Sequence, residues 1–331
     1  MAETVIRCPA CGAPLVPPSR FARTMVCAFC AAVVTLDPSV VKVARFREAR
    51  ADWDGLSLPR SSIVGGKAWS LGALLGRGDV SDVFDGERLH GATGGARPAG
   101  ERAVVKVLRS ESDLPVFDRE WATLSAIVNS AAPGAPAFSR RVPEPVTRGV
   151  IEAGPLAGRH VLIVRATPTF RFTLQQIRRD GAPDMARASL WVWRRVLEIL
   201  TFLHRAGLVH GAILPPHVLV QDDDHGARLV GFGNAGGPGS PRLTTSLDFA
   251  TCYPSGEPSA ASDVIMSART LLWLLGDAQG PPAGLPAPYA RTLADASRGA
   301  FSDAWALREH LGTIARQAFG APAFCPLVSA R

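Results

Sequence analysis

The chain is poor in lysine. Only three lysines, at positions 42, 67 and 106, occur among the 36 basic residues of its 331 positions, and the other basic residues are arginines. The basic residues outnumber 29 acidic ones and give a formal net charge of +7. They form no clustered block of the kind that marks a nucleic-acid surface, so the charge argues against nucleic acid as a partner.

Long apolar runs and a secretory leader are also lacking. No stretch approaches the ~18 apolar residues that span a bilayer. The N-terminal "MAETVIRCPACGAP" does not have the basic-then-apolar layout of a signal peptide. We therefore expect a cytoplasmic protein without a membrane partner, long enough for one domain of about 250 residues and a small second one.

Four of the six cysteines form two C-x2-C pairs, "CPAC" (Cys8, Cys11) and "CAFC" (Cys27, Cys30). Two such knuckles supply the four soft ligands of a tetrahedral Zn²⁺ site. A redox site needs only one C-x2-C pair, and the cytosol disfavours disulfides, so a metal site is favoured over both. A segment of some 30 residues buries too little apolar surface to fold alone, so we predict a structural zinc ribbon over residues 1–36.

The rest of the chain divides into a linker and an α+β domain. Asp37 and Pro38 are helix-start signals, which predict a helix over 38–53 in a linker spanning 37–62. Short β-type runs follow at 68–76, 81–89, 102–109, 146–153 and 159–166, with a helical stretch at 114–130. Later apolar periodicity predicts helices at 185–207, 262–276 and 302–318.

Residues 63 to about 320 resemble eukaryotic-type protein kinases. "LGRGDVSDVF" resembles their glycine-rich loop through Gly76 and Gly78, and "AVVKVL" resembles the strand of the nucleotide-binding lysine, here Lys106. Glu120 matches the helix glutamate that pairs with this lysine, and Asp263 matches the aspartate of the central helix. The resemblance implies a bilobal domain over 63–331, with a β-rich N-lobe (63–166) and a helical, truncated C-lobe (167–331).

The departures from that family fall on catalytic positions. Where the family reads H-R-D-L-K-P-x-N, Ala212 replaces the aspartate that accepts the substrate proton, and His217 replaces a magnesium-binding asparagine. Gly231 replaces the metal-binding aspartate of D-F-G. A general base alone contributes typically ~10² to 10⁴ in rate. We therefore expect a pseudokinase that is not an enzyme.

The resemblance leaves a vestigial ATP site as an open alternative, formed by Gly76, Gly78, Lys106 and Glu120. Asp79 at the tip of the glycine-rich loop would repel phosphate in the absence of a metal, and Val104 stands where the family has a small alanine over the adenine. The lysine and glutamate could equally serve only to orient their helix. The family's packing residues are retained at Leu124, His210, Phe232 and Asp263.

We expect a scaffold or allosteric regulator in a bacterial protein-signalling complex. The resemblance implies protein partners such as an active kinase, a phosphatase, a von Willebrand-type protein or a chaperone-like protein. One alternative is an atypical ATP-binding transferase or ATPase that uses His217 or the aspartates at 222–224, which otherwise form a polar hairpin turn. Another is nucleic-acid binding through the ribbon. Glu257 and Arg298 are matched to an ion pair of the family's large lobe.

Overall fold

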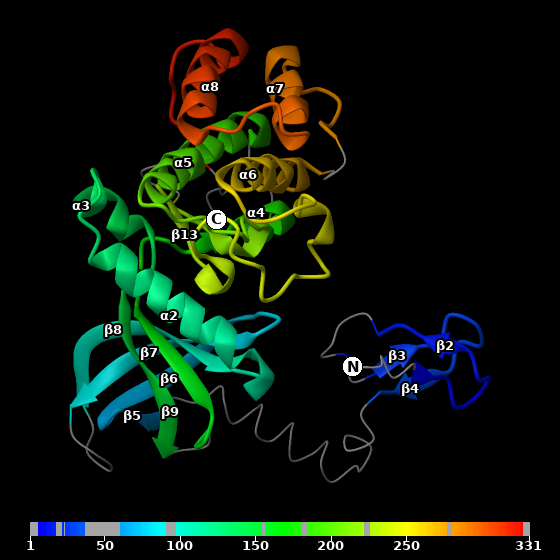
Figure 1. The fold of residues 1–331 in the computed structure, drawn as a ribbon, viewed down its shortest axis with the longest axis vertical. Helices are drawn as coiled ribbons and strands as arrows, with labels where there is room; N and C mark the ends of the chain where they lie inside the picture. Colours follow the sequence, from blue (N-terminus) through cyan, green and yellow to red (C-terminus); the bar gives the residue numbers. More distant parts are fainter. Residues whose placement is uncertain are drawn as a thin grey trace.

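The computed structural model describes residues 6–17, 22, 24–36, 60–90, 97–153, 156–180, 184–221, 226–276 and 280–326. These residues form a pair of small hairpins, a strand-rich lobe and a helical lobe, and Figure 1 shows helix α2 between the strands and the helical lobe. The helix expected over 38–53 lies outside the described residues.

The cysteine-rich segment consists of two hairpins with the same construction. β1 (Ile6–Arg7) pairs antiparallel with β2 (Pro14–Leu15), and β3 (Thr24–Val26) pairs antiparallel with β4 (Val33–Thr35). The buried core of the segment consists of two cysteines and two apolar side chains: Cys8, Leu15, Cys27 and Val34. The hairpins are too small to bury more.

The strand-rich lobe is a closed six-stranded barrel with the strand order β10-β8-β7-β6-β5-β9. Its strands are β5 (Arg60–Val64), β6 (Lys67–Arg77), β7 (Ser81–His90), β8 (Arg97–Leu108), β9 (Pro145–Ala153) and β10 (His160–Arg165). Alternate residues such as Trp69, Leu71, Val105 and Val107 fill the interior. β5 pairs with both β6 and β9 and leaves no open sheet edge. It also spans the predicted domain boundary at 62/63.

Helix α2 (Leu114–Val128) connects the barrel to the helical lobe. Pro115 stands in its first turn, where proline costs no helix hydrogen bond. Its buried face includes Phe117, Leu124 and Ile127, which belong to the same core cluster as the helical lobe. The position of Glu120 is therefore fixed by packing on both sides.

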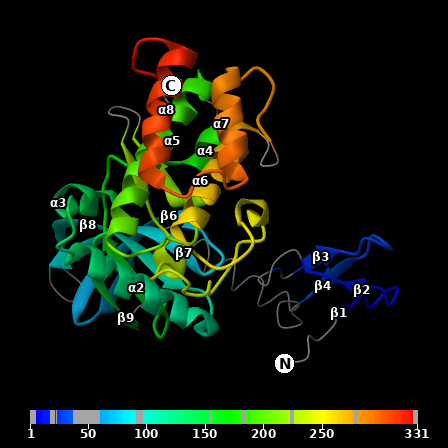
Figure 2. The same cartoon turned by 45° about the horizontal axis from the view of Figure 1, so that its top comes forward.

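The helical lobe is built on two long buried helices, α5 (Met185–Arg205) and α6 (Ala260–Leu275). The Asp184 carboxylate caps α5 by accepting from the Arg187 N–H, and Ser259 and Ser262 form a capping box at the start of α6. The remaining elements are α3 (Ala135–Phe138), α4 (Leu174–Asp180), α7 (Ala287–Ser297), α8 (Ala304–Phe319) and a small sheet of β11 (Phe172–Thr173), β12 (Val218–Val220) and β13 (Ala227–Leu229). Figure 2 shows α5, α7 and α8 side by side.

Within the described part of the chain, no helix combines the length and the apolar character that crossing a membrane requires.

Candidate metal and nucleotide sites

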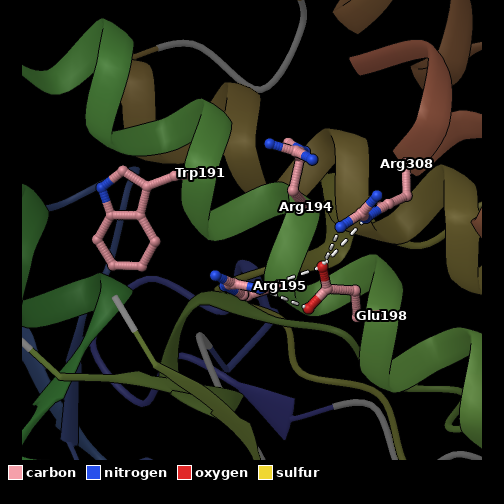
Figure 3. Close-up of a pocket in the computed structure, with 5 residues that line it drawn as sticks. All are labelled: Trp191, Arg194, Arg195, Glu198 and Arg308. Atoms are coloured by element: carbon pink, nitrogen blue, oxygen red, sulfur yellow. Dashed lines mark hydrogen bonds and ion pairs between the residues drawn. The ribbon is translucent and has the colours of Figure 1, made fainter. Parts of the chain in front are cut away.

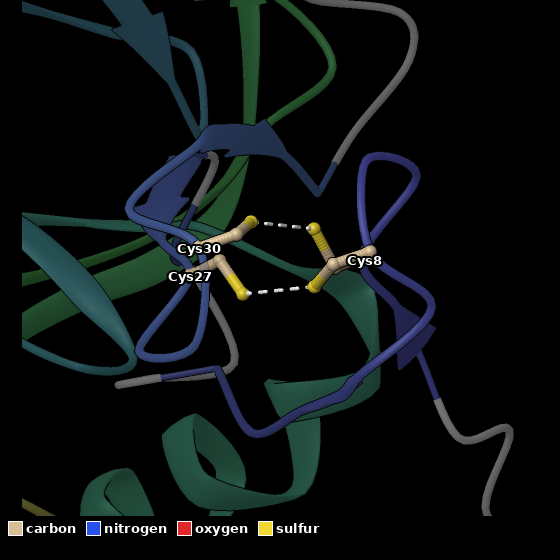
Figure 4. A group of neighbouring side chains, drawn as sticks. Cys8, Cys27 and Cys30 are labelled. Carbon is tan, nitrogen blue, oxygen red and sulfur yellow. Dashed lines mark hydrogen bonds between the residues drawn. The ribbon is translucent and has the colours of Figure 1, made fainter.

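The four cysteines predicted as metal ligands come together. Their sulfur atoms all lie within 4.8 Å of one another, and Cys8–Cys30 and Cys11–Cys27 are 3.7 Å apart (Figure 4). A tetrahedral ion with Zn–S bonds of about 2.3 Å places neighbouring sulfurs about 3.8 Å apart, whereas a disulfide needs about 2.05 Å. The cluster therefore fits one tetrahedral metal ion and not a pair of disulfides.

The two knuckles have the same pattern of internal backbone hydrogen bonds. Cys8 N donates to Ala13 O and Cys27 N donates to Ala32 O, both at 2.8 Å. The fifth residue of each knuckle adopts a left-handed conformation: Gly12 has φ 76° and Ala31 has φ 57°. Backbone N–H groups at Phe29 and Cys30 lower the pKa of the Cys27 thiol to about 7, which favours the thiolate that a metal binds.

Lys106 and Glu120, the two charged residues of the predicted nucleotide site, form an ion pair between β8 and α2. The Glu120 side chain is 3% exposed and that of Lys106 is 17% exposed. The other carboxylate oxygen of Glu120 accepts the backbone N–H of Phe232 at 3.3 Å. This one carboxylate therefore links the barrel, α2 and the "GFGN" segment in a single arrangement.

The retained packing residues meet beneath this pair. Leu124, His210 and Phe232 are fully buried, and the His210 and Phe232 rings lie 4.5 Å apart. Asp263 is also fully buried, and its two carboxylate oxygens accept the backbone N–H groups of His210 and Gly211, each at 2.8 Å. The loop that would carry catalysis is thus held from α6.

His217 occupies the space over Gly231. Its Nδ1 donates to the carbonyl of Ala212 at 2.8 Å, so its Nε2 carries the lone pair in the neutral ring. A Cβ built on Gly231 would lie 2.6 Å from this Nε2. Burial lowers the pKa of the His217 imidazole, and the Lys106 charge lowers it further. The imidazole therefore stands next to the backbone position that carries a metal-binding aspartate in the family, and it is neutral at pH 7.

The glycine-rich turn is short. Gly78 N donates to Ser81 O at 2.8 Å and closes the β6–β7 hairpin, and the Arg109 guanidinium donates to Gly78 O at 3.0 Å. Gly76 has no atom within 4 Å of the place where a Cβ would lie, so that side of the turn is open. Val104 lies two residues before Lys106 on the half-buried face of β8.

Two further expectations have different outcomes. The ion pair between Glu257 and Arg298 is wrong, because Glu257 is exposed and Arg298 pairs with Asp295 at 2.8 Å. Arg269 makes the link across this region instead, by donating to Tyr253 O at 2.7 Å and to Ser297 O at 3.1 Å. The aspartates at 222–224 lie outside the described residues.

Sequence reasoning missed Asn234, which organises the segment after Gly233. Its side-chain oxygen accepts the N–H of Leu243 at 2.9 Å, and its amide nitrogen donates to Thr244 O at 2.7 Å. The available signal was an amide directly after "GFG", a residue type that can satisfy a donor and an acceptor of a loop at once. Asn234 is buried at 3% exposure.

No family model matches the chain. Two curated proteins are similar to part of it, and both are named serine/threonine-protein kinase AfsK. The one from Streptomyces coelicolor is 36% identical over 130 residues, 39% of this chain and 16% of that protein. The one from Streptomyces griseus is 32% identical over 136 residues, 38% of this chain and also 16% of that protein. The likeness thus covers about a sixth of each relative's length.

Solved structures extend the likeness to most of the fold. A rhoptry antigen kinase domain of Toxoplasma gondii has a TM-score of 0.57 at 15% identity, covering 83% of this chain and 92% of that one. The vaccinia related kinase 3 structure has a TM-score of 0.54 at 15% identity, covering 85% and 98%. The chain therefore has a protein kinase-like fold.

These likenesses correct the expectation that the chain is not an enzyme. Both curated relatives are named serine/threonine-protein kinases. The names of these relatives contradict the non-enzyme class, while the solved structures show the fold alone. The expectation relied on single catalytic positions and gave too little weight to the rest of the site, where Lys106 and Glu120 are paired.

Proposed function

We propose that the chain is an atypical kinase-like phosphotransferase of a bacterial signalling complex, with an ATP site centred on Lys106 and a structural Zn²⁺ held by its four clustered cysteines. One observation carries the proposal: the Lys106–Glu120 ion pair is assembled, and Glu120 is also tied to Phe232 N. Protein kinases need this pair in place to bind and orient ATP.

In the proposed site, the roles of the residues differ from those in other kinases. Lys106 would hold the phosphates, and the open side of Gly76 leaves room for them. ATP with its metal would supply the transferable phosphoryl group. The lone pair of His217 Nε2 faces the position of Gly231, so a neutral nitrogen stands in place of the family's carboxylate. Because Ala212 cannot accept a proton, we expect turnover ~10² to 10⁴ below the usual kinase range.

Thermal shift and label transfer from γ-³²P-ATP test this proposal on the full zinc-loaded chain. With ATP and Mg²⁺ or Mn²⁺, the melting temperature should rise, since a ligand at 100 times its Kd adds about 2.7 kcal/mol. Slow label transfer to protein should accompany the shift. Lys106→Met should abolish both effects.

Lys67→Met is the matched control, because Lys67 is an exposed lysine on β6. It should leave both effects unchanged. The proposal fails if no nucleotide–metal combination shifts the wild-type melting temperature or yields transfer, or if both variants behave alike.

A second function, protein docking through the ribbon, is favoured by a separate observation. Three apolar side chains of the β3–β4 hairpin face solvent: Val26 is 61% exposed, and Phe29 and Val33 are each 73% exposed. Val26 and Val33 are cross-strand partners, so they lie side by side. Such a group fits a partner protein of the complex, such as a kinase, a phosphatase, a von Willebrand-type protein or a chaperone-like protein.

Co-purification from the native host tests the docking role. The double variant Phe29→Ser/Val33→Ser keeps all four cysteines, so it should still bind Zn²⁺ while losing a partner that the wild type retains. Identical partner sets for the two proteins would count against docking here. Binding to nucleic acid that weakens steeply with salt would favour the alternative function of the ribbon.

A further inference from the structure

A small pocket in the helical lobe is lined largely by arginine. It lies between α5 and α8 and is bounded by Trp191, Arg194, Arg195, Glu198 and Arg308 (Figure 3). Its volume of about 80 Å³ is several times the 10–15 Å³ or so that one water needs. The elements that carry Lys106, Glu120 and His217 do not contribute to it.

Glu198 is the carboxylate that lines this pocket, and it is already engaged. It accepts from Arg308 at 2.9 and 3.0 Å and from Arg195 at 2.9 Å. Arg308 also pairs with Glu309. The three arginines and two glutamates leave one positive charge in excess.

Arg194 is the arginine that this network leaves out. Figure 3 shows it beside the Glu198 network, and within the described part of the chain it makes no hydrogen bond or ion pair. Its Nε is buried without a partner. Burial lowers the pKa of its guanidinium, and the nearby Arg308 charge lowers it further. An unpaired, half-buried cation of this kind costs free energy unless an anion completes it.

The backbone of α8 makes room for this side chain. A Cβ at Gly312 would lie 3.6 Å from Arg194 Nη2, so the guanidinium rests against the part of the helix that has no side chain. The Arg194 guanidinium carries five N–H donors, and no side chain or carbonyl among the described residues accepts from its buried Nε. A ligand that meets this guanidinium together with those of Arg195 and Arg308 needs several acceptor oxygens, and a single carboxylate has only two.

We propose that this pocket binds a phosphate-type oxyanion, with Arg194 as its principal ligand and Arg308 and Arg195 at its sides. A phosphoryl group presents three strong acceptor oxygens and up to two charges, which suits guanidinium forks. Free phosphate and a phosphorylated polypeptide segment share this chemistry. The site does not depend on the proposed ATP site.

Titration calorimetry of the full zinc-loaded chain at low salt tests the proposal. The probes are inorganic phosphate, a phosphoserine peptide and the same peptide with glutamate in place of phosphoserine. Saturable binding of either phosphate probe, at least tenfold tighter than binding of the glutamate peptide, supports the site. The probe that binds more tightly shows whether the ligand is free phosphate or a phosphorylated polypeptide segment. Equal binding of the glutamate peptide, or no saturable binding of any probe, overturns it.

The variants separate this site from a structural arginine and from the ATP site. Arg194→Gln should weaken phosphate binding at least tenfold without lowering the melting temperature, because it removes an unpaired charge. Arg205→Gln, on the same helix outside the pocket, should stay within twofold of wild type, as should Lys106→Met. Equal weakening by Arg194→Gln and Arg205→Gln would overturn the assignment, and so would a fall in melting temperature with unchanged binding for Arg194→Gln.

Discussion

At the scale of single residues, His217 and Gly231 share one space. The imidazole atoms lie 2.6–2.7 Å from the place where a Cβ on Gly231 would be, and Gly231 has φ 80°. A larger residue at 231 therefore collides with His217 and is strained in its backbone as well. The departure at 231 therefore cannot be reversed while the His217 imidazole holds this position.

Gly231→Ala should accordingly lower the free energy of unfolding by about 2–4 kcal/mol, from overpacking and left-handed strain together. The double variant His217→Ala/Gly231→Ala should recover the steric part, giving a coupling of about 1 kcal/mol or more in a double-mutant cycle. Gly207→Ala isolates the strain, because Gly207 has φ 75° and nothing within 4 Å of its Cβ position. Strictly additive losses in urea titrations would contradict the shared space.

The buried His210 makes stability depend on pH. Burial lowers its pKa from 6.5 to about 4, although the neighbouring Asp263 carboxylate raises it. Its Nε2 lies 3.2 Å from Val230 O and its Nδ1 lies 3.3 Å from the Ala212 N–H. In the neutral ring, Nε2–H donates and Nδ1 accepts, so both nitrogens are used.

The unfolded state therefore binds a proton below pH 6.5 that the folded state binds only below about pH 4. Stability should fall as the pH drops through this window, by about 3 kcal/mol from His210, and His217 acts in the same direction. Urea titrations at pH 7 and pH 4.5 would measure the loss. His210→Phe should be less stable at pH 7 but should lose less on acidification. An unchanged pH slope in this variant would refute the assignment.

At the scale of elements, the two cysteine knuckles differ in one residue that matters for their backbones. Gly12 adopts its left-handed conformation freely, whereas Ala31 is the single described residue other than glycine with positive φ. Left-handed backbone costs an L-residue about 1–2 kcal/mol, and glycine loses about 0.5–1 kcal/mol through chain entropy.

Ala31→Gly should therefore tighten zinc binding by about 0.5–1 kcal/mol, a factor of two to five. Gly12→Ala should weaken it by a similar amount, because nothing lies within 4 Å of its Cβ position and only the backbone changes. Competition with a chromophoric chelator measures both. If the two substitutions shift the affinity in the same direction, the strain at Ala31 does not limit the site.

The elements that could be predicted from the sequence have a clear local pattern, and those that could not lack one. Long apolar periodicity located α5 and α6, and β-type runs located the main barrel strands. Helix α7 is not among the predicted helices: Pro286 precedes it and Pro288 stands in its first turn, although its buried Tyr289 and Leu293 lie at helical spacing. β5 was missed because its five residues gain their pairing from β6 and from the distant β9.

The sites also differ in whether a local sequence pattern predicts them. The cysteine cluster and the Lys106–Glu120 pair were predicted because their spacing is local or matches a known pattern. The arginine pocket was not predicted, because it arises only where α5 and α8 pack and Gly312 opens a space. The contact of His217 with Gly231 could not be predicted either, because fourteen positions of sequence separate the two residues.

At the scale of the whole molecule, the described residues form three buried clusters of different size. The largest runs from α2 through the helical lobe, the second fills the barrel, and the third is the cysteine cluster. The third shares no residue with the other two. The first contains Leu108, Leu162 and Val164 from the barrel strands, so the barrel and the helical lobe are joined by packing. We expect these two lobes to unfold together.

Metal removal should then affect one part of the molecule alone. A structural zinc contributes about 10–16 kcal/mol to the folding of such a small unit, so EDTA should unfold residues 6–36 and leave the main thermal transition unchanged. Hydrogen exchange should show lost protection in β1–β4 and constant protection in α5 and α6. Cys27→Ser should reproduce this result without chelator, and added Zn²⁺ should restore only the wild type. A main transition lowered by several degrees would instead mean that the ribbon supports the kinase-like domain directly.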